Sequence, residues 1–208
     1  MSQDLILYTN PMSRGRIVRW MLEEVGCPYE AKVVDFGPAM RAPEFLALNP
    51  MGKVPAIRHG DTVVTECAAI CAYLADAFPQ AGLAPAPSER GAYYRALFFG
   101  AGPLEQAATN HAMGFEPAGE RNQGLAGYGS YARTLDALEK LVPAEGYICG
   151  AQFTAADLYL GSHIGWGLEF GSIEKRPGFA EYYARVGDRP AHRRATELDD
   201  ALMPADAG

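Results

Sequence analysis

The chain has 208 residues, of which 49% are hydrophobic and 21% charged, the balance of an ordinary globular protein. Its 18 basic and 25 acidic side chains give a formal net charge of −7, without the dense basic stripe that nucleic-acid-binding proteins carry. No apolar run approaches the about 20 residues of a membrane helix, and the first residues lack a signal-peptide pattern. We therefore expect a cytoplasmic protein with no nucleic-acid and no membrane partner.

Residues 4–80 alternate between short apolar segments and amphipathic ones. We predict strands over 5–8, 29–34, 54–58 and 62–64, and helices over 13–25, 43–48 and 67–78. In the first of these helices, Arg16, Arg19 and Glu23 are expected to face outward. The order β-α-β-α-β-β-α, with a right-handed crossover between the first two strands, predicts an α/β thioredoxin-like N-terminal domain with a mixed four-stranded sheet.

The run Ala84-Pro85-Ala86-Pro87 is the strongest boundary signal in the chain. We therefore predict a first domain over 1–80, a linker over 81–87 and an all-α helical bundle over 88–208. Within the bundle, helices are expected over about 88–111, 125–141, 154–170 and 178–186. The Gly-rich segment 114–124 is predicted to be a mobile loop, and 199–208 a frayed tail.

The cysteines and histidines do not form a metal-binding pattern. The chain has Cys27, Cys67, Cys71 and Cys149, and the histidines His59, His111, His163 and His192, with neither a Cys-x-x-Cys motif nor ligand spacing. We expect free thiols, no metal and, without a glycine-rich phosphate loop, no nucleotide. A thiol redox protein stays open as an alternative, because Cys67 lies at a predicted helix start, where the pKa of a thiol falls.

The segment Asn49-Pro50-Met51-Gly52-Lys53-Val54-Pro55 directly precedes the predicted strand pair. A cis bond before Pro55 would expose the backbone N–H and C=O of Val54 at a concave edge. A ligand that contains a peptide bond could then pair antiparallel with Val54. The alternative is a plain Gly-Lys loop that leads into a hairpin.

A second motif, Thr65-Glu66-Cys67-Ala68-Ala69-Ile70, spans the change from a strand to a helix. Helix N-termini present unpaired N–H groups and a partial positive charge, which suit a ligand carboxylate, and Glu66 could bind a ligand ammonium group. The alternative is that Thr65 or Glu66 only caps its own helix.

The third motif, Tyr8-Thr9-Asn10-Pro11-Met12-Ser13-Arg14, leads from the first strand into the first helix. Ser13 is either an ordinary N-cap or a donor of a hydrogen bond to a bound thiolate. No general base is required in the second case, because the hydroxyl stabilises an anion and is not the nucleophile.

Together these three segments resemble the glutathione transferase family. Pro11-Met12-Ser13 is similar to its serine-type catalytic motif, and residues 49–55 and 66–70 are typical of its glutathione site. Phe153-Thr154-Ala155-Ala156-Asp157 resembles the helix-capping signature of its second domain, with Thr154 and Asp157 as a capping box.

The resemblance implies a site for glutathione as co-substrate. The implied roles are sulfur contact for Ser13, with Tyr8 as the alternative; main-chain pairing for Val54 before a cis Pro55; binding of the γ-glutamyl end for Glu66 and Cys67; and binding of the glycyl carboxylate for Lys53 and Arg41. Cys67 stands where the family usually has Ser or Thr, and a thiol is a weaker donor than a hydroxyl.

The implied reaction is conjugation of glutathione to a small hydrophobic electrophile, as in detoxification, with Met12, His111 and Phe115 as candidate pocket walls. The resemblance also implies a homodimer, into whose partner subunit Met51 could project. Two alternatives share the scaffold: a glutathione-dependent isomerase, dehalogenase or thiol reductase, and a non-catalytic binding protein.

Overall fold

The structure, a computed structural model, describes residues 4–203 of the chain. Its contacts divide the chain into two compact units. The sheet unit contains the described residues up to Gly82 and from Arg189 onward, and the helical unit is Leu83–Asp188. Within residues 4–203, no helix is both long and apolar enough to cross a membrane.

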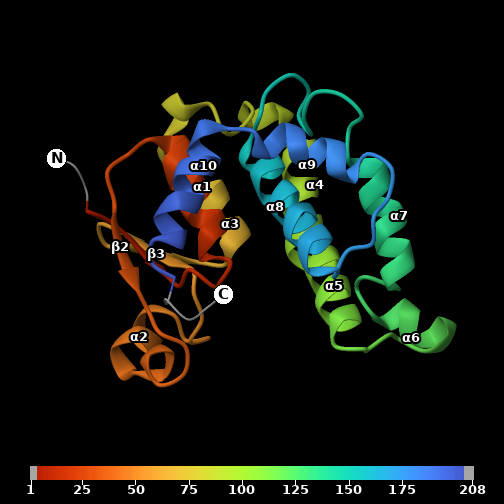
Figure 1. Cartoon of the computed structure of the whole chain (residues 1–208), viewed down its shortest axis with the longest axis horizontal. Helices are drawn as coiled ribbons and strands as arrows, with labels where there is room; N and C mark the ends of the chain where they lie inside the picture. The colour runs from red at the N-terminus through yellow and green to blue at the C-terminus, as the bar shows by residue number, and fades with distance from the viewer. Residues whose placement is uncertain (1–3, 204–208) are drawn as a thin grey trace. The chain divides into compact units, whose positions relative to one another are not determined.

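The sheet unit is built on a four-stranded sheet in the order β2-β1-β3-β4 (Figure 1). Its strands are β1 (Leu5–Thr9), β2 (Glu30–Val33), β3 (Ala56–His59) and β4 (Thr62–Thr65). In β1, Leu7 lies opposite Ala31 of the parallel β2 and opposite Ile57 of the antiparallel β3. The β3–β4 pair is antiparallel, so the predicted mixed thioredoxin-like sheet is confirmed.

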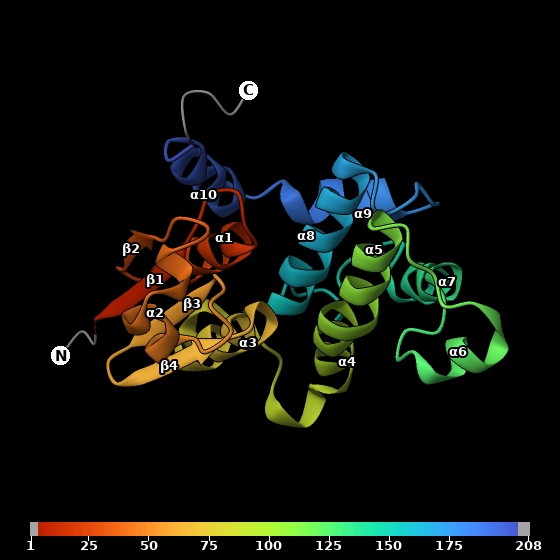
Figure 2. The ribbon, with the colours of Figure 1, turned by 90° about the horizontal axis from the view of Figure 1, so that it is seen from below.

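Helices cover both faces of this sheet. They are α1 (Gly15–Val25), η1 (Ala39–Arg41), α2 (Pro43–Leu48), α3 (Cys67–Ala77) and η2 (Pro79–Ala81). Helices α1 and α3 contact each other, and they contact β1 and β4 respectively. Since side chains alternate along a strand, Tyr8 faces away from Leu7, and its ring lies 6.2 Å from that of Phe45 in α2. Figure 1 shows α2 on the side of the sheet away from α1, and in the view from below in Figure 2 the ribbon of α2 overlaps the strands.

The last helix, α10 (Pro190–Asp200), packs against α1 and belongs to the sheet unit. This differs from the predicted helical domain over 88–208 and from the predicted tail over 199–208, of which 204–208 lie outside the described residues. Arg19 does not face solvent as expected: its Nε donates to Asp199 at 2.8 Å, and both side chains are buried. Burial raises the pKa of Asp199, and the adjacent Arg19 opposes that rise.

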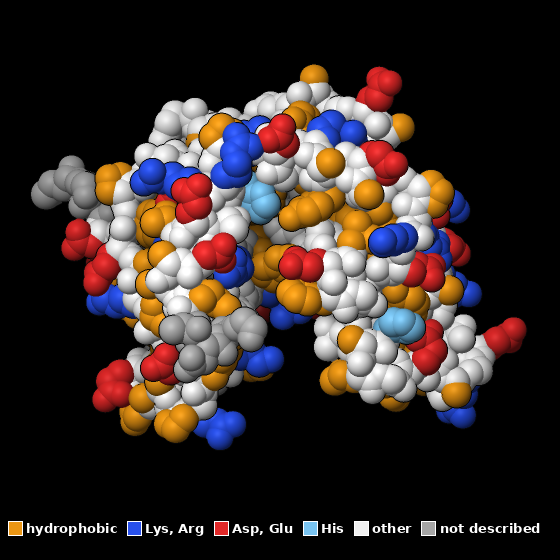
Figure 3. Space-filling model, in the orientation of Figure 1, with side chains coloured by type: hydrophobic (Ala, Val, Ile, Leu, Met, Phe, Trp, Pro, Cys, Tyr) orange, Lys and Arg blue, Asp and Glu red, His pale blue; other side chains and the backbone are white. Residues whose placement is uncertain are grey.

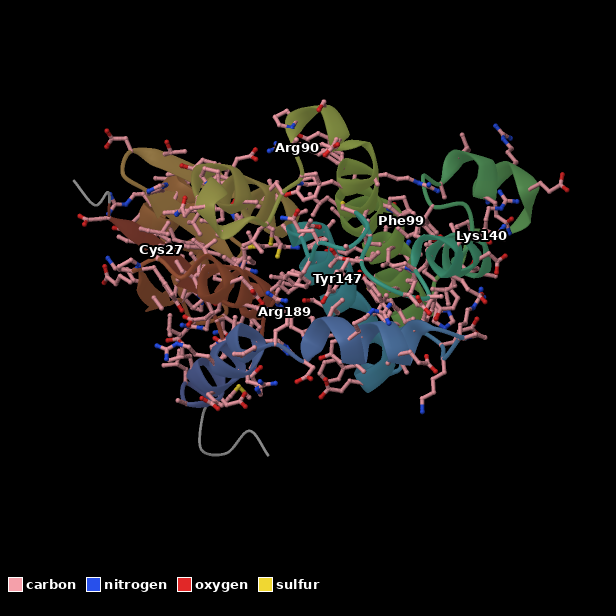
Figure 4. The ribbon with its side chains drawn as sticks, turned by 90° about the horizontal axis from the view of Figure 1, so that it is seen from above. Cys27, Arg90, Phe99, Lys140, Tyr147 and Arg189 are labelled. Atoms are coloured by element: carbon pink, nitrogen blue, oxygen red, sulfur yellow. The ribbon has the colours of Figure 1, made fainter. Side chains whose placement is uncertain are left out.

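Two further contacts join α10 to α1. Arg189, labelled in Figure 4, donates to both carboxylate oxygens of Glu24 at 2.6 and 2.7 Å. The rings of His192 and Trp20 have centroids 4.2 Å apart. The charged residues of α1 therefore form ion pairs with the segment of α10, so the polar side of α1 packs against a helix and does not face solvent.

The helical unit confirms the predicted all-helical second domain. Its elements are η3 (Pro87–Glu89), α4 (Gly91–Phe99), the π-helix η4 (Gly100–Leu104), α5 (Glu105–Ala112), α6 (Gly119–Leu125), α7 (Tyr131–Leu141), α8 (Ala155–Phe170) and α9 (Phe179–Gly187). Helix α8 contacts both α4 and α9, and its residues from Ala155 to Gly165 are all buried. This explains the mostly apolar sequence of α8.

Two boundaries in the helical unit differ from the predictions. The segment 114–124, expected to be a loop, includes most of α6, where the N–H of Ala126 bonds to Asn122 at the C-terminal end. The helix expected from residue 125 begins only at Tyr131, because Ser130 is its N-cap and accepts from the N–H of Arg133 at 3.3 Å.

The predicted capping box at the start of α8 is present. The carboxylate of Asp157 accepts from the N–H of Thr154 at 2.9 Å, the N–H of Ile148 at 2.7 Å and the hydroxyl of Tyr182 at 2.9 Å. Burial raises the pKa of Asp157, and these hydrogen bonds oppose that rise. Asp157 therefore joins the start of α8 to α9, through Tyr182, and to the loop that precedes α8, through Ile148.

Replacing Asp157 with alanine should lower the free energy of unfolding by about 3 kcal/mol or more, because several buried donors lose their acceptor at once. Urea denaturation followed by circular dichroism measures this loss. Asp136→Ala is the matched control, since it removes an exposed carboxylate whose pair with Arg176 contributes little. Equal losses in the two variants would contradict the structural role of Asp157.

Candidate functional site

A pocket of about 390 Å³ opens in the sheet unit. It is formed by three loops: one between β1 and α1, one between β2 and α2, and one before β3. The lining residues are Met12, Ser13, Arg14, Phe36, Gly37, Met40, Arg41, Gly52, Lys53 and Val54. Five predicted site residues thus come together here, Met12, Ser13, Arg41, Lys53 and Val54.

The loop between β1 and α1 is folded around the side chain of Asn10, which is 4% exposed. Its Oδ1 accepts from the N–H of Met12 at 3.0 Å, and its Nδ2 donates to the carbonyl of Val34 at 3.1 Å. Its own carbonyl accepts from the N–H of Ser13 at 3.0 Å. Asn10 therefore fixes Ser13 relative to the sheet, as expected of an asparagine side chain that forms a turn with its own backbone.

The loop before β3 has the same construction around Asn49, which is 3% exposed. Its Oδ1 accepts from the N–H of Met51 at 3.0 Å, and its Nδ2 donates to the carbonyl of Lys53 at 2.7 Å. Gly52 follows with φ of 59°, and a Cβ there would meet the Met40 carbonyl at 2.7 Å, so only glycine fits.

The main chain of Val54 is available to a ligand. The Val54–Pro55 peptide bond is cis, as the resemblance implies. The backbone N–H and C=O of Val54 make no hydrogen bond to another residue in the described part of the chain. They border the pocket, whereas Pro55 is buried and does not line it. Backbone N–H and C=O groups that are half-buried normally have a hydrogen-bond partner, either protein or water.

The hydroxyl of Ser13 already has two partners. It donates to the Asn10 carbonyl at 2.7 Å and accepts from the N–H of Gly15 at 2.9 Å. Helix α1 begins at Gly15, two residues later than predicted, so Ser13 precedes the helix and its half-buried side chain lines the pocket. Tyr8 does not line the pocket and packs against Phe45.

The pocket is electropositive. Arg14, Arg41 and Lys53 line it, and none of its lining residues is acidic. Arg41 and Lys53 are exposed, and neither pairs with a carboxylate within residues 4–203. Such a pocket favours a ligand that carries carboxylates.

Glu66 and Cys67, at the start of α3, do not line this pocket. Glu66 has φ of 64°, the left-handed region that non-glycine residues rarely adopt, and its side chain does not cap α3. Cys67 is buried, with its Sγ 3.8 Å from the carbonyl oxygen of Arg14, a lining residue. The motifs at 8–14 and 65–70 are therefore neighbours, although only the first contributes residues to the pocket lining.

His111 and Phe115 belong to the helical unit and do not line the pocket, all of whose residues lie in the sheet unit. Both are exposed, and the His111 ring stacks on Tyr131 with centroids 3.8 Å apart. On the face shown in Figure 3, hydrophobic side chains gather over α8 and α9 of the helical unit, while acidic and basic side chains are interspersed over the sheet unit.

The cysteines show no sign of thiol chemistry. All four are free. Burial raises the pKa of both Cys27 and Cys149, and Cys67 and Cys71 are buried, which disfavours attack by their thiols. In the described part of the chain, no three His, Cys, Asp or Glu side chains cluster closely enough to hold a metal ion.

The two buried asparagines, Asn10 and Asn49, are not among the predicted site residues. The signal that could have found them is the repeated tripeptide Asn-Pro-Met, at 10–12 and again at 49–51. An asparagine two residues before a backbone N–H is the usual start of such a turn.

Comparisons with known proteins agree with this geometry. The family models "Glutathione S-transferase, N-terminal domain" and "Glutathione S-transferase, C-terminal domain" match residues 12–77 and 116–185. Glutathione S-transferase GstA of Escherichia coli O157:H7 is 31% identical over 166 residues, which are 76% of this chain and 77% of that protein.

Solved structures give the same result over nearly the whole chain. A glutathione transferase from Methylococcus capsulatus is 31% identical with a TM-score of 0.73, covering 95% of this chain and 99% of its own. A glutathione transferase homolog from Sulfitobacter, solved with bound glutathione, is 26% identical with a TM-score of 0.75, covering 98% and 100%. The chain therefore belongs to the glutathione S-transferase family and is a glutathione transferase.

Proposed function

We propose that this transferase binds glutathione in the pocket of the sheet unit, stabilises its thiolate and conjugates the sulfur to a small hydrophobic electrophile. The observation that carries the proposal is the main chain of Val54, which has no hydrogen-bond partner within residues 4–203 and borders a pocket lined by Ser13 and by cations. The peptide-like backbone of glutathione supplies the matching N–H and C=O groups, in the manner of a short added strand.

The charges of the pocket match the ends of the tripeptide. We assign the glycyl carboxylate to Lys53 and Arg41, which line the pocket and have no carboxylate partner among the described residues. The γ-glutamyl end is assigned to Glu66 and Cys67, where the first turn of α3 suits a carboxylate and the Glu66 carboxylate suits an ammonium group. The Cys67 thiol donates more weakly than a hydroxyl, so the backbone at this position contributes most of the binding.

The energy needed to ionise the sulfur is modest. A thiol of pKa ~8.5 is only about 3% thiolate at pH 7, and lowering that pKa by ~2 units requires about 2.7 kcal/mol of preferential stabilisation. A charge-assisted hydrogen bond from Ser13 contributes roughly 1.5–3 kcal/mol. To donate it, Ser13 must release the Asn10 carbonyl, which costs about 0.5–1.5 kcal/mol.

The net contribution of Ser13 is therefore about 1–2 kcal/mol. The first turn of α1 adds roughly 0.3–1 kcal/mol to the stabilisation of the thiolate. The cationic side chains that line the pocket stabilise the thiolate further. Ser13 is thus assigned as the main donor to the sulfur but not as the whole source of ionisation. Tyr8 is the weaker candidate because its side chain packs on Phe45, outside the pocket.

We assign a hydrophobic wall of the electrophile site to Met12, and the wall roles that the sequence suggests for His111 and Phe115 stay predictions. Met12 is 53% exposed at the pocket, and Phe115 is 57% exposed. Conjugation of such electrophiles is a detoxification reaction. The free thiols agree with a reducing, cytoplasmic location, and we propose a homodimer into whose partner subunit the exposed Met51 projects.

The Ser13→Ala protein should still bind to a column of immobilised glutathione. Its kcat should fall about 5- to 30-fold, the equivalent of the 1–2 kcal/mol assigned to the Ser13 hydroxyl. Conjugation to 1-chloro-2,4-dinitrobenzene measures the rate. Tyr8→Phe is the matched control, because it removes the hydroxyl of the alternative donor, and it should keep the wild-type rate. Full activity in Ser13→Ala would remove Ser13 from the mechanism, and loss of activity in Tyr8→Phe would transfer its role to Tyr8.

Lys53→Gln should raise the KM for glutathione about fivefold or more while changing kcat little, because it removes a charge from binding and not from the sulfur. Arg41→Gln should act in the same direction. Lys32→Gln is the control, since Lys32 is a partly exposed lysine of β2 that lies 3.7 Å from Glu30 and is not a pocket residue. An unchanged KM in the Lys53 variant would exclude Lys53 from the glutathione site.

Light scattering of the purified chain should give about twice its mass of 22.4 kDa. Met51→Asp should shift the mass toward that of a monomer, because it places a charge at a proposed apolar contact. A monomeric wild-type protein would contradict the proposed dimer.

A further inference from the structure

One side chain connects the C-terminal helix to the loop that carries Ser13. Arg16, in the first turn of α1, donates through its Nε to the carbonyl of Pro11 at 2.5 Å. Its Nη2 donates to the carboxylate of Asp200, the last residue of α10, at 2.7 Å. A single guanidinium thus binds the backbone two residues before Ser13 and the end of α10 at once.

Three further ion pairs between the C-terminal segment and α1 lie farther along α1. Arg194 pairs with Glu23 at 2.6 Å and Arg189 with Glu24 at 2.6 Å, both near the C-terminal end of α1. The buried pair of Arg19 and Asp199 joins the middle of α1 to α10. The Arg16–Asp200 pair, in contrast, continues to the loop through the hydrogen bond of Arg16 to the Pro11 carbonyl.

We propose that Arg16 is a positioning residue, held by Asp200, that fixes the Pro11–Ser13 backbone while the Ser13 hydroxyl turns from the Asn10 carbonyl toward the glutathione sulfur. This inference rests on the proposed function. Through Arg16, the C-terminal helix contributes to the reaction without touching glutathione.

The hydrogen bonds of the loop explain why such a residue is useful. Without ligand, the Ser13 side chain itself helps to close the loop, through its bonds to Asn10 and Gly15. Donation to the sulfur removes the first of these bonds. The N–H bonds of Met12 and Ser13 to Asn10 and the charge-assisted bond of Arg16 to Pro11 then hold the backbone. A donor that is fixed before the reaction stabilises an anion better than one that must first be ordered.

The test compares variants that break this connection in two places. Asp200→Ala removes the carboxylate that holds Arg16, and Arg16→Lys replaces the two-point guanidinium with a single ammonium group. Asp200→Glu is the rescue variant. Arg194→Gln is the matched control, because it breaks another α1–α10 ion pair that does not reach the loop.

We expect Asp200→Ala and Arg16→Lys to speed hydrogen exchange of the amides of residues 12–15. Both variants should also raise the pKa of the thiol of bound glutathione, which is measured by the absorbance of the thiolate. The kcat for 1-chloro-2,4-dinitrobenzene should fall about three- to tenfold, with KM for glutathione within about twofold of wild type. The urea midpoint should barely move, because Asp200 is 58% exposed and such pairs contribute little to stability. Asp200→Glu and Arg194→Gln should behave as wild type.

Unchanged amide exchange, or faster exchange with an unchanged thiol pKa and kcat, would overturn the positioning role of Arg16. An equal effect of Arg194→Gln would overturn it as well, since α10 would then act only through general packing. A wild-type chain that neither binds nor conjugates glutathione would instead overturn the proposed function, and the exchange rates would still show whether Asp200 and Arg16 order the loop.

Discussion

The pocket depends on two buried asparagine side chains that make the hydrogen bonds to backbone groups which another backbone segment would otherwise make. Asn10 and Asn49 each accept from the N–H two residues onward. Asn10 also donates to the carbonyl of Val34, after β2, and Asn49 donates to the carbonyl of Lys53 in its own loop. An unpaired buried amide would cost about 1–3 kcal/mol, so each loop is held in the one conformation that satisfies its asparagine. In both cases a proline follows and limits the chain further. The two loops thereby hold Ser13 and Val54 in place before any ligand arrives.

The same pocket combines groups that are satisfied with groups that are not. Asn10, Asn49 and Ser13 have their hydrogen bonds within the protein, whereas the main chain of Val54 and the charges of Arg41 and Lys53 are left for a ligand. Unpaired polar groups are tolerated here because they border solvent, and a ligand that pairs with them gains their full interaction. The satisfied groups give the site its rigidity, and the unsatisfied ones give it affinity for an anionic peptide.

Helix α10 extends this arrangement from the far end of the sequence. Its carboxylates and arginines pair with opposite charges along α1, including the buried Arg19–Asp199 pair, so α1 is packed on two sides. Breaking a buried pair leaves an uncompensated charge and is more costly than losing an exposed pair, which makes Arg19 and Asp199 structural. The exposed Asp200 is different: its small contribution to stability leaves the orientation of Arg16 as its clearest effect.

Residue patterns alone predict the order of elements in the sheet unit and the helical character of the second unit, whereas the capping box at Thr154 and Asp157 follows from the family resemblance. The order and type of the elements depend on local periodicity and turn-forming residues, which can be recognised in a linear chain. The burial of Arg19, the packing of α10 on α1 and the acceptor of the Ser13 hydroxyl become visible only in the folded chain. A charged residue with no partner nearby in sequence is indistinguishable from a solvated one, because its partner is about 180 residues away and only folding brings the two together.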